Sequence, residues 1–266
     1  ATYNDGGIVD CISVMRDAHN IYGRAEFLES IQRAGWFVLQ SQLPPPQPGW
    51  AQQYNQYLQP AWARAFEPPS VCPLVTIQNV QLLMDLFVLL EDDDYLEPIP
   101  DAIAWVESTR LPNGLWPRFV EIGTGQPLYY DRGRIRVDSV DELSVERRTG
   151  YGYEYDISEA ISMGKERFRH IRETGVDPNV ERPVDELAPE EIAGNLDTIR
   201  PKVVAAIESL DEEGRWVVEN DRYKVRESGI KIWQGDYEVS DRLSSALFNQ
   251  NVEVLCDYLE LVGVDR

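Results

Sequence analysis

Apolar residues recur at the spacing of an α-helix along most of this chain. Near the start, Ile8, Ile12 and Met15 fall on one face of such a helix. The same pattern predicts helices over residues 5–20, 24–40, 73–90, 99–108, 157–172, 189–210 and 240–261. Asn4 and Asp5 stand where the first helix would have its N-cap. Because the helices follow one another in pairs, the pattern favours an α/α toroid or a solenoid.

Short segments between the helices predict strands rather than a continuous sheet. We expect short β pieces over residues 116–121, 128–130 and 134–137, and a hairpin-like piece from Gly214–Val217 and Gly229–Trp233. Residues 175–186 are rich in proline and charge and predict a linker. The helix over residues 73–90 is apolar on nearly all sides, so it should be central. The predicted class is mostly α, an (α/α) toroid-like helical domain with short β pieces.

The composition is strongly acidic, and nearly all of the basic residues are arginine. The net charge of the 266 residues is −21, and the 25 basic residues include only four lysines. Nucleic acid is not expected as a partner, because its binding needs a basic face. An acid-rich, lysine-poor surface is typical of salt-adapted, halophilic proteins, since salt screens the self-repulsion. An acidic extracellular enzyme is the alternative interpretation.

Several common kinds of site and segment are not supported. The most apolar stretch, Val71–Leu90, is interrupted by four polar residues, so we expect no membrane partner. The first residues do not read as a signal peptide, which we expect to be absent or already removed. Three widely spaced cysteines predict buried thiols, with one disulfide as the alternative in a secreted setting. His19 and His170 lack the local frame of a catalytic triad, and Glu91–Asp94 lacks EF-hand spacing.

Residues 49–69 combine aromatic side chains, one arginine and one acid. They read Gly49-Trp50-Ala51-Gln52-Gln53-Tyr54 and continue to Trp62-Ala63-Arg64-Ala65-Phe66-Glu67-Pro68-Pro69. Flat aromatic faces suit sugar rings, and the arginine fork suits a carboxylate. Because the prolines keep the preceding residues extended or turned, we interpret the segment as a loop that presents side chains. The alternative is a core-packing loop with buried tryptophans and an Arg64–Glu67 ion pair.

Four motifs stand in order along the first part of the chain: Tyr3-Asn4-Asp5, Trp62 to Ser70, Trp116 to Thr124, and Arg147 to Tyr151. They resemble the motifs of the pectic acid lyases, the pectate lyases of polysaccharide lyase family ten. The resemblance implies that residues 1–156 form a lyase-like toroid portion. Residues 157–266 are then a C-terminal helical extension packed on the same domain. The family's DNGAT-type Asp-Asn pair and GGWPQ loop are not found here, and Gly6 replaces the asparagine that usually follows the aspartate.

The resemblance implies a secreted, calcium-assisted enzyme that cleaves polygalacturonate by β-elimination, giving 4,5-unsaturated oligogalacturonates. Arg64 matches the family's base, although arginine is almost never deprotonated in a protein. Asp5 matches a calcium ligand, and Arg118 and Arg147 match binders of substrate carboxylates. Half of the calcium site is missing with the Asp-Asn pair. We expect the three arginines to converge in space, because an acidic protein must concentrate cations where it meets an acidic polymer.

Aromatic residues of the loop are further candidates for substrate contact, namely Trp50, Trp62 and Tyr54, and Tyr54 is the next candidate for the base. Structural alternatives exist for most of these residues. They are an N-cap for Asp5, ion pairs with Glu121 and Glu146 for Arg118 and Arg147, and the core for the tryptophans.

Two rival functions remain open from the sequence. The first is a non-catalytic pectin-binding module derived from such a lyase, which the missing Asp-Asn motif favours. The second is a toroidal glycoside hydrolase, which would use Glu67 and Asp5 as its two carboxylates. In each case the chain is expected to be a monomer.

Overall fold

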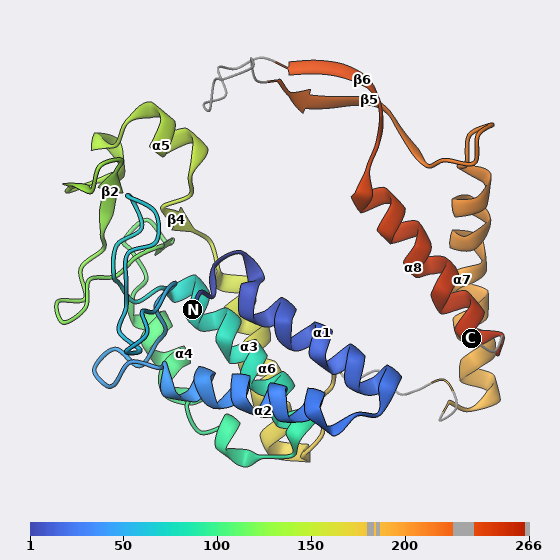
Figure 1. The fold of residues 1–266 in the computed structure, drawn as a ribbon, viewed down its shortest axis with the longest axis horizontal. Coiled ribbons are helices and arrows are strands. Elements are labelled where there is room, and N and C mark those ends of the chain that lie inside the picture. Colours follow the sequence, from blue (N-terminus) through green and yellow to red (C-terminus); the bar gives the residue numbers. More distant parts are fainter. Residues whose placement is uncertain (180–183, 185–186, 226–236, 264–266) are drawn as a thin grey trace. The chain divides into compact units, whose positions relative to one another are not determined.

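The computed structural model describes residues 1–179, 184, 187–225 and 237–263. Contacts within the chain divide it into two compact units, residues 1–179 and 180–266 (Figure 1). Helices dominate the described residues, and the strands of the first unit are two or three residues long. The predicted class, mostly α with short β pieces, is therefore confirmed.

The helices of the first unit include a central one, against which three others pack. They are α1 (Gly7–Tyr22), α2 (Ala25–Gln40), α3 (Pro73–Leu90), α4 (Ile99–Ser108), α5 (Val145–Gly150) and α6 (Ser158–Thr174). Three 3₁₀ turns accompany them: η1 (Asn4–Gly6), η2 (Asp93–Tyr95) and η3 (Val140–Glu142). α1 packs on α2, α2 packs on α3, and α3 contacts both α4 and α6 (Figure 1).

α3 forms the middle of the core. Ten of its 18 residues are buried, and Pro73 occupies the first turn, where its missing N–H leaves no bond unmade. By length and hydropathy alone α3 would also pass as a membrane span, yet 56% of that stretch is buried inside the structure. The central position predicted for residues 73–90 is confirmed.

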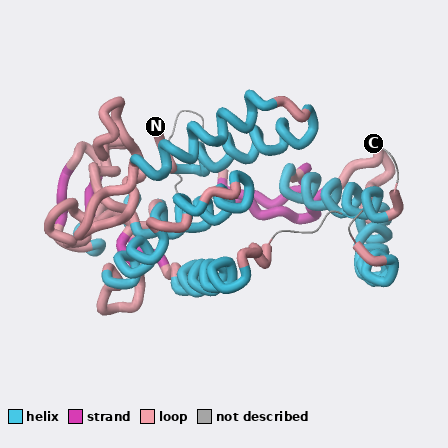
Figure 2. The backbone as a smooth tube through the Cα atoms, turned by 90° about the horizontal axis from the view of Figure 1, so that it is seen from below, coloured by secondary structure: helices cyan, strands magenta, loops and turns pink. Residues whose placement is uncertain are grey.

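Long loops gather at one end of these helices (Figure 2). There β1 (Trp116–Pro117) pairs antiparallel with β4 (Glu154–Tyr155), and β2 (Tyr129–Asp131) pairs antiparallel with β3 (Ile135–Val137). Backbone bonds join the loops across long separations in sequence. The N–H of Val71 donates to the carbonyl of Val120 at 2.9 Å, and the N–H of Tyr3 donates to the carbonyl of Gln52 at 2.9 Å. The four sequence motifs are thereby brought to one end of the unit.

Three details of the first unit differ from the predictions. Asn4 and Asp5 belong to η1, and the N-cap of α1 is Gly6, with a left-handed φ of 75°. Residues 145–150, for which the sequence predicts no element, form the short helix α5. Cys72 is buried as predicted, whereas Cys11 on α1 is an exposed free thiol, as is Cys256 in the second unit, so the prediction of buried thiols is wrong for these two.

The second unit combines two helices with a hairpin. α7 (Pro189–Glu208) packs on α8 (Ser245–Leu261), and β5 (Val217–Lys224) pairs antiparallel with β6 (Tyr237–Leu243). Residues 240–243, predicted as the start of the last helix, lie in β6, where Ser240, Arg242 and Leu243 pair with residues of β5. α8 starts later because the Ser244 hydroxyl caps the N–H of Leu247. The predicted β piece Gly229–Trp233 and part of the predicted linker 175–186 lie outside the described residues.

The boundary between the units falls after α6, which belongs to the first unit. This helix packs on α3 and α4, so the division by contacts falls after Asn179, while the resemblance placed it after residue 156. That the C-terminal extension packs on the lyase-like portion stays a prediction.

Gly49 allows the loop after α2 to lie against the core. A Cβ at this position would stand 2.6 Å from the ring of Trp105 and 2.7 Å from Oγ1 of Thr76, and both side chains are buried. Because neither can move away in a packed core, we expect Gly49→Ala to lower the free energy of unfolding by about 2 kcal/mol. Urea unfolding followed by tryptophan fluorescence measures this. Gly150→Ala is the control, since its Cβ would meet no atom within 4 Å; an equal loss in both variants would contradict the steric explanation.

Candidate active site

A buried carboxylate, that of Glu67, organises the loop that carries Arg64. Its Oε1 accepts hydrogen bonds from the Arg64 guanidinium and from the Tyr151 hydroxyl, both at 2.6 Å. Its Oε2 accepts from the backbone N–H of Arg64 at 3.0 Å. The N–H of Glu67 donates back to the carbonyl of Arg64 at 3.0 Å, which closes a turn over residues 64–67. The Arg64–Glu67 pair, given as an alternative from the sequence, is therefore present.

The charges of this cluster follow from its hydrogen bonds. Burial alone would raise the pKa of Glu67, but the bonds from Arg64 and Tyr151 outweigh it and lower the pKa to about 2. The same bond from Glu67 raises the pKa of Arg64. Burial, together with Glu67, raises the pKa of Tyr151. Glu67 is thus ionised at neutral pH, Arg64 is cationic, and Tyr151 is a neutral donor.

Three arginines meet at the ring of Tyr151. The guanidinium carbons of Arg118, Arg147 and Arg64 lie 4.3, 5.4 and 5.7 Å from its centroid. Cations are attracted to the face of an aromatic ring, so the ring can hold positive charges that would otherwise repel one another. These arginines come from three different motifs, and the structure brings them together as the sequence analysis expected.

Arg118 is held by neutral acceptors. Its guanidinium donates to the Tyr155 hydroxyl, to Oδ1 of Asn4 at 3.5 Å and to Oε1 of Gln52 at 3.3 Å. Glu121, its expected alternative partner, instead pairs with Arg136 at 2.6 Å. Among the residues that the structure describes, no carboxylate forms an ion pair with Arg118. A half-buried cation without a counter-charge is well suited to meet an anion from solvent.

Arg147 lies deeper than expected. Its side chain is only 8% exposed, and its guanidinium pairs with Glu146 at 2.7 Å and stacks 4.1 Å from the centroid of Phe66. This is the ion pair that the sequence analysis gave as the alternative. In this conformation the Arg147 guanidinium lies inside the protein against the rings of Phe66 and Tyr151, and it does not reach the surface.

Two of the aromatic candidates belong to the core. Trp50 is fully buried, and its indole N–H donates to the carbonyl of Val38 at 2.8 Å. Tyr54 is 2% exposed, its hydroxyl accepts from the N–H of Ala51 at 2.7 Å, and burial raises its pKa. A sugar ring cannot reach either side chain, and a buried phenol with a raised pKa stays protonated at neutral pH, so it cannot accept a proton. The predictions of substrate contact at Trp50 and Tyr54 are therefore wrong.

Trp62 remains half-exposed and has a cationic neighbour that the sequence analysis missed. Its ring packs edge-on against Tyr130, with centroids 5.2 Å apart. The guanidinium carbon of Arg134 lies 4.6 Å from the Trp62 centroid. The signal in the sequence is the alternation of arginines in Arg132-Gly133-Arg134-Ile135-Arg136, which places three cations on one hairpin.

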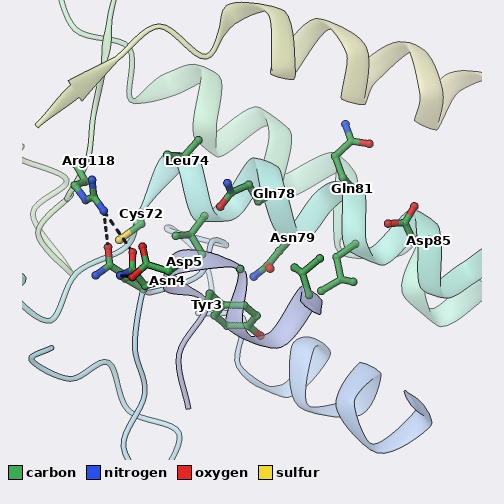
Figure 3. Close-up of a pocket in the computed structure, with 15 residues that line it drawn as sticks. Tyr3, Asn4, Asp5, Cys72, Leu74, Gln78, Asn79, Gln81, Asp85 and Arg118 are labelled. Atoms are coloured by element: carbon green, nitrogen blue, oxygen red, sulfur yellow. Dashed lines mark hydrogen bonds between the residues drawn. The ribbon is translucent and has the colours of Figure 1, made fainter. Parts of the chain in front are cut away.

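Asp5 lines a pocket of about 460 Å³ between η1, α1 and α3. Figure 3 shows Arg118, Asn4 and Asp5 together at one end of it, and Gln81 and Asp85 at the other. Asp5 is not the N-cap of α1, because that position is held by Gly6. Its carboxylate is exposed and accepts from the amide of Asn4 at 2.8 Å. Oxygen donors of this kind suit calcium. However, within the described residues no three His, Cys, Asp or Glu side chains come together to hold a metal, and the role of Asp5 as a calcium ligand stays a prediction.

The lowered pKa of Glu67 predicts a loss of stability in acid. An ordinary glutamate has a pKa near 4.3, so the Glu67 contribution is present above that pH. It is lost as the pH falls from about 4 through about 2, the pKa in the folded state. We expect Glu67→Gln to lower the free energy of unfolding at pH 7 by roughly 2–3 kcal/mol and to flatten this part of the pH profile.

Urea unfolding at pH 7, 4 and 2.5 measures both effects. Glu29→Gln is the matched control, because Glu29 is exposed and its one ion-pair partner among the described residues is Arg33, at 3.8 Å. A wild-type profile for Glu67→Gln would contradict the assignment of the lowered pKa to this buried cluster.

A sequence profile and two solved structures that resemble this chain both concern polysaccharide lyases. The sequence profile described as "Pectic acid lyase" matches residues 111–162, which contain Arg118 and Arg147. Two solved structures of a family 10 polysaccharide lyase from Cellvibrio cellulosa are similar in fold. One is a mutant in complex with trigalacturonic acid, with a TM-score of 0.54 and 19% identity, and the other has a TM-score of 0.54 and 20% identity. No match is found among curated proteins.

The alignments define how far this likeness extends. Each covers 66% of this chain, and they cover 63% and 62% of the two lyase chains, so this chain spans less than two thirds of their length. At this identity the structural likeness concerns the fold, and it confirms the toroid-like helical domain predicted from the sequence. Motifs, sequence profile and fold agree, and the resemblance of this chain to the pectic acid lyases of polysaccharide lyase family ten is confirmed.

Proposed function

We propose that this chain is a polysaccharide lyase that cleaves polygalacturonate by calcium-assisted β-elimination and gives 4,5-unsaturated oligogalacturonates. The observation that carries the proposal is the convergence of Arg64, Arg118 and Arg147 on the ring of Tyr151. Arg64 and Arg147 are paired with Glu67 and Glu146, but Arg118 has no carboxylate partner among the described residues, and an unpaired cation on a protein of net charge −21 suits an acidic ligand. The solved relative with trigalacturonic acid bound supports the choice of that acid.

The reaction depends first on positive charge that stabilises the negative charge developing on the uronate, and a base is needed in addition. β-Elimination removes the weakly acidic proton on C5 of a uronate, and negative charge then builds on the neighbouring carboxylate. Fixed cations stabilise that charge because they need no reorganisation during the reaction. We assign Arg118 this part, since it is half-buried and has no acidic partner among the described residues. Arg147 adds positive charge from its buried position against the rings of Phe66 and Tyr151.

Arg64 is the proposed catalytic residue. Its side chain is 51% exposed, so the guanidinium can touch the substrate while Glu67 holds its backbone turn. In the free protein Glu67 raises the pKa of Arg64, which opposes the role of base. Arg64 can therefore accept the C5 proton only as the neutral guanidine. It would reach that form only if substrate binding separates it from Glu67, neighbouring cations lower its pKa and its own proton leaves to solvent.

Calcium enters this proposal through Asp5. When bound, the ion would help to neutralise the uronate carboxylate. Asp5 would supply one oxygen ligand, and substrate carboxylates and water would have to supply others. Asn4 holds the Asp5 carboxylate at 2.8 Å and also accepts from Arg118 at 3.5 Å, so it orients both groups toward the same end of the pocket.

A non-catalytic pectin-binding module is the second candidate. It is favoured by the incomplete calcium ligand set of the described residues and by the ion pair of Arg64 with Glu67. A glycoside hydrolase is disfavoured, because Glu67 is buried with a pKa of about 2 and cannot serve as a general acid at neutral pH. For either retained candidate we infer a secreted monomer whose acidic surface is adapted to salt.

An assay with polygalacturonate and calcium tests the proposal. The unsaturated product absorbs in the ultraviolet, and we expect Arg64→Ala to lower the rate of its formation by at least about a thousandfold. Arg33→Ala, at an exposed pair on α2, is the control and should keep the wild-type rate. Thermal unfolding of both variants checks that they remain folded.

The same samples separate the candidates. New reducing ends without ultraviolet absorbance would indicate hydrolysis, and binding of the polymer without either signal would indicate the binding module. Full lyase activity in Arg64→Ala would contradict the catalytic assignment.

A further inference from the structure

The β2–β3 hairpin carries three arginines, and the middle one, Arg134, differs from the other two in its ion pairing. Arg132 donates to Oε2 of Glu146 at 2.9 Å, and Arg136 donates to Oε1 of Glu121 at 2.6 Å. Within the described ranges, Arg134 forms no ion pair with any carboxylate. The chain has 46 acidic residues against 25 basic ones, so the composition does not force an exposed arginine to lack a counter-charge.

The backbone of Arg134 is held in the left-handed conformation, which is unfavourable for most residues that carry a Cβ atom. Its φ is 63°, in the left-handed region, where glycine or asparagine would be unstrained. Its N–H donates at 3.0 Å to the carbonyl of Ala65, the residue that follows Arg64. A strained residue that is fixed beside the candidate catalytic turn indicates a role for its side chain.

The Arg134 guanidinium is supported on one face by an indole. Its central carbon lies 4.6 Å from the Trp62 centroid, and the arginine as a whole is exposed. Stacking on a ring covers one flat face of the guanidinium and leaves the N–H groups at its edge free for another partner. Those edge donors match the two oxygens of a carboxylate.

We propose that Arg134, stacked on Trp62, is a further substrate-binding residue that holds the carboxylate of a second uronate unit, next to the unit at Arg64. The proposal rests on the function proposed above and extends it along the polymer. Arg118 shares the ring of Tyr151 with Arg64, and Ala65 joins Arg64 to Arg134. The three arginines therefore stand on segments that contact one another, and more than one cation near the candidate site suits a polymer that repeats a carboxylate in every unit.

Binding of oligogalacturonates of two lengths tests this proposal. Isothermal titration with calcium present would compare the hexamer and the trimer on wild type and Arg134→Asn, with Arg64→Ala added to every protein in this test so that the oligomers are bound without being cleaved. We expect the variant to bind the hexamer about tenfold more weakly, as the loss of one charge-assisted hydrogen bond implies. The trimer should lose less than about threefold, because it can occupy the other subsites. The melting temperature should stay equal or rise, since asparagine accepts the left-handed conformation.

Two further variants make the outcome specific. Arg134→Lys keeps the charge but loses the planar fork, so its affinity for the hexamer should fall between wild type and Arg134→Asn. Arg136→Asn is the matched control on the same hairpin, because Glu121 already neutralises Arg136. It should bind both oligomers as wild type does.

The failures of the two proposals are distinguishable. If Arg134→Asn binds the hexamer as tightly as wild type while Arg118→Ala loses affinity, only the role of Arg134 is overturned. An equal loss in Arg136→Asn overturns it as well, because the effect would then be one of net charge. If wild type binds neither oligomer, the proposed function and the role of Arg134 are both overturned.

Discussion

The ionised carboxylate of Glu67, held inside the protein, is the interaction on which the site depends. A buried charge is tolerated only where donors surround it, and Glu67 receives three, two from Arg64 and one from Tyr151. Because those donors come from two distant loops, one carboxylate fixes the turn that presents Arg64 and also the place of the Tyr151 ring. The arginines that stack on this ring are then placed indirectly by Glu67.

The central helix α3 anchors the loop that carries Arg64. α3 is apolar on nearly all sides, yet it buries Thr76, whose hydroxyl accepts from the N–H of Trp50 at 3.0 Å. Trp50 in turn fills the core and donates to the carbonyl of Val38 on α2. The loop that leads to Arg64 is thereby attached to two helices before it reaches the surface. Rigid elements hold functional side chains more accurately than free loops do.

Periodicity in the sequence was enough to predict seven of the helices, since helical spacing is a local property. Strand β6 was missed because a hairpin is selected by pairing with β5, which no local window reveals. The motifs found Arg64 and Arg118, but residue type alone could not separate a buried Trp50 from a half-exposed Trp62. That difference depends on packing against distant segments. Arg134 was missed because its stacking and its strained φ exist only in the folded chain.

The preference for arginine over lysine also has a structural explanation. Each of the cation–aromatic contacts described in this chain involves an arginine, and several surround Tyr151, Phe66 and Trp62. A lysine is a strongly hydrated point charge, whereas a guanidinium can lie flat on a ring and still present donors at its edge. Stacking does not by itself leave a cation unpaired, since Arg64 and Arg147 stack on these rings and also pair with Glu67 and Glu146. Among the described residues, Arg118 and Arg134 stack without a carboxylate partner, so they are the cations best placed to meet an acidic ligand.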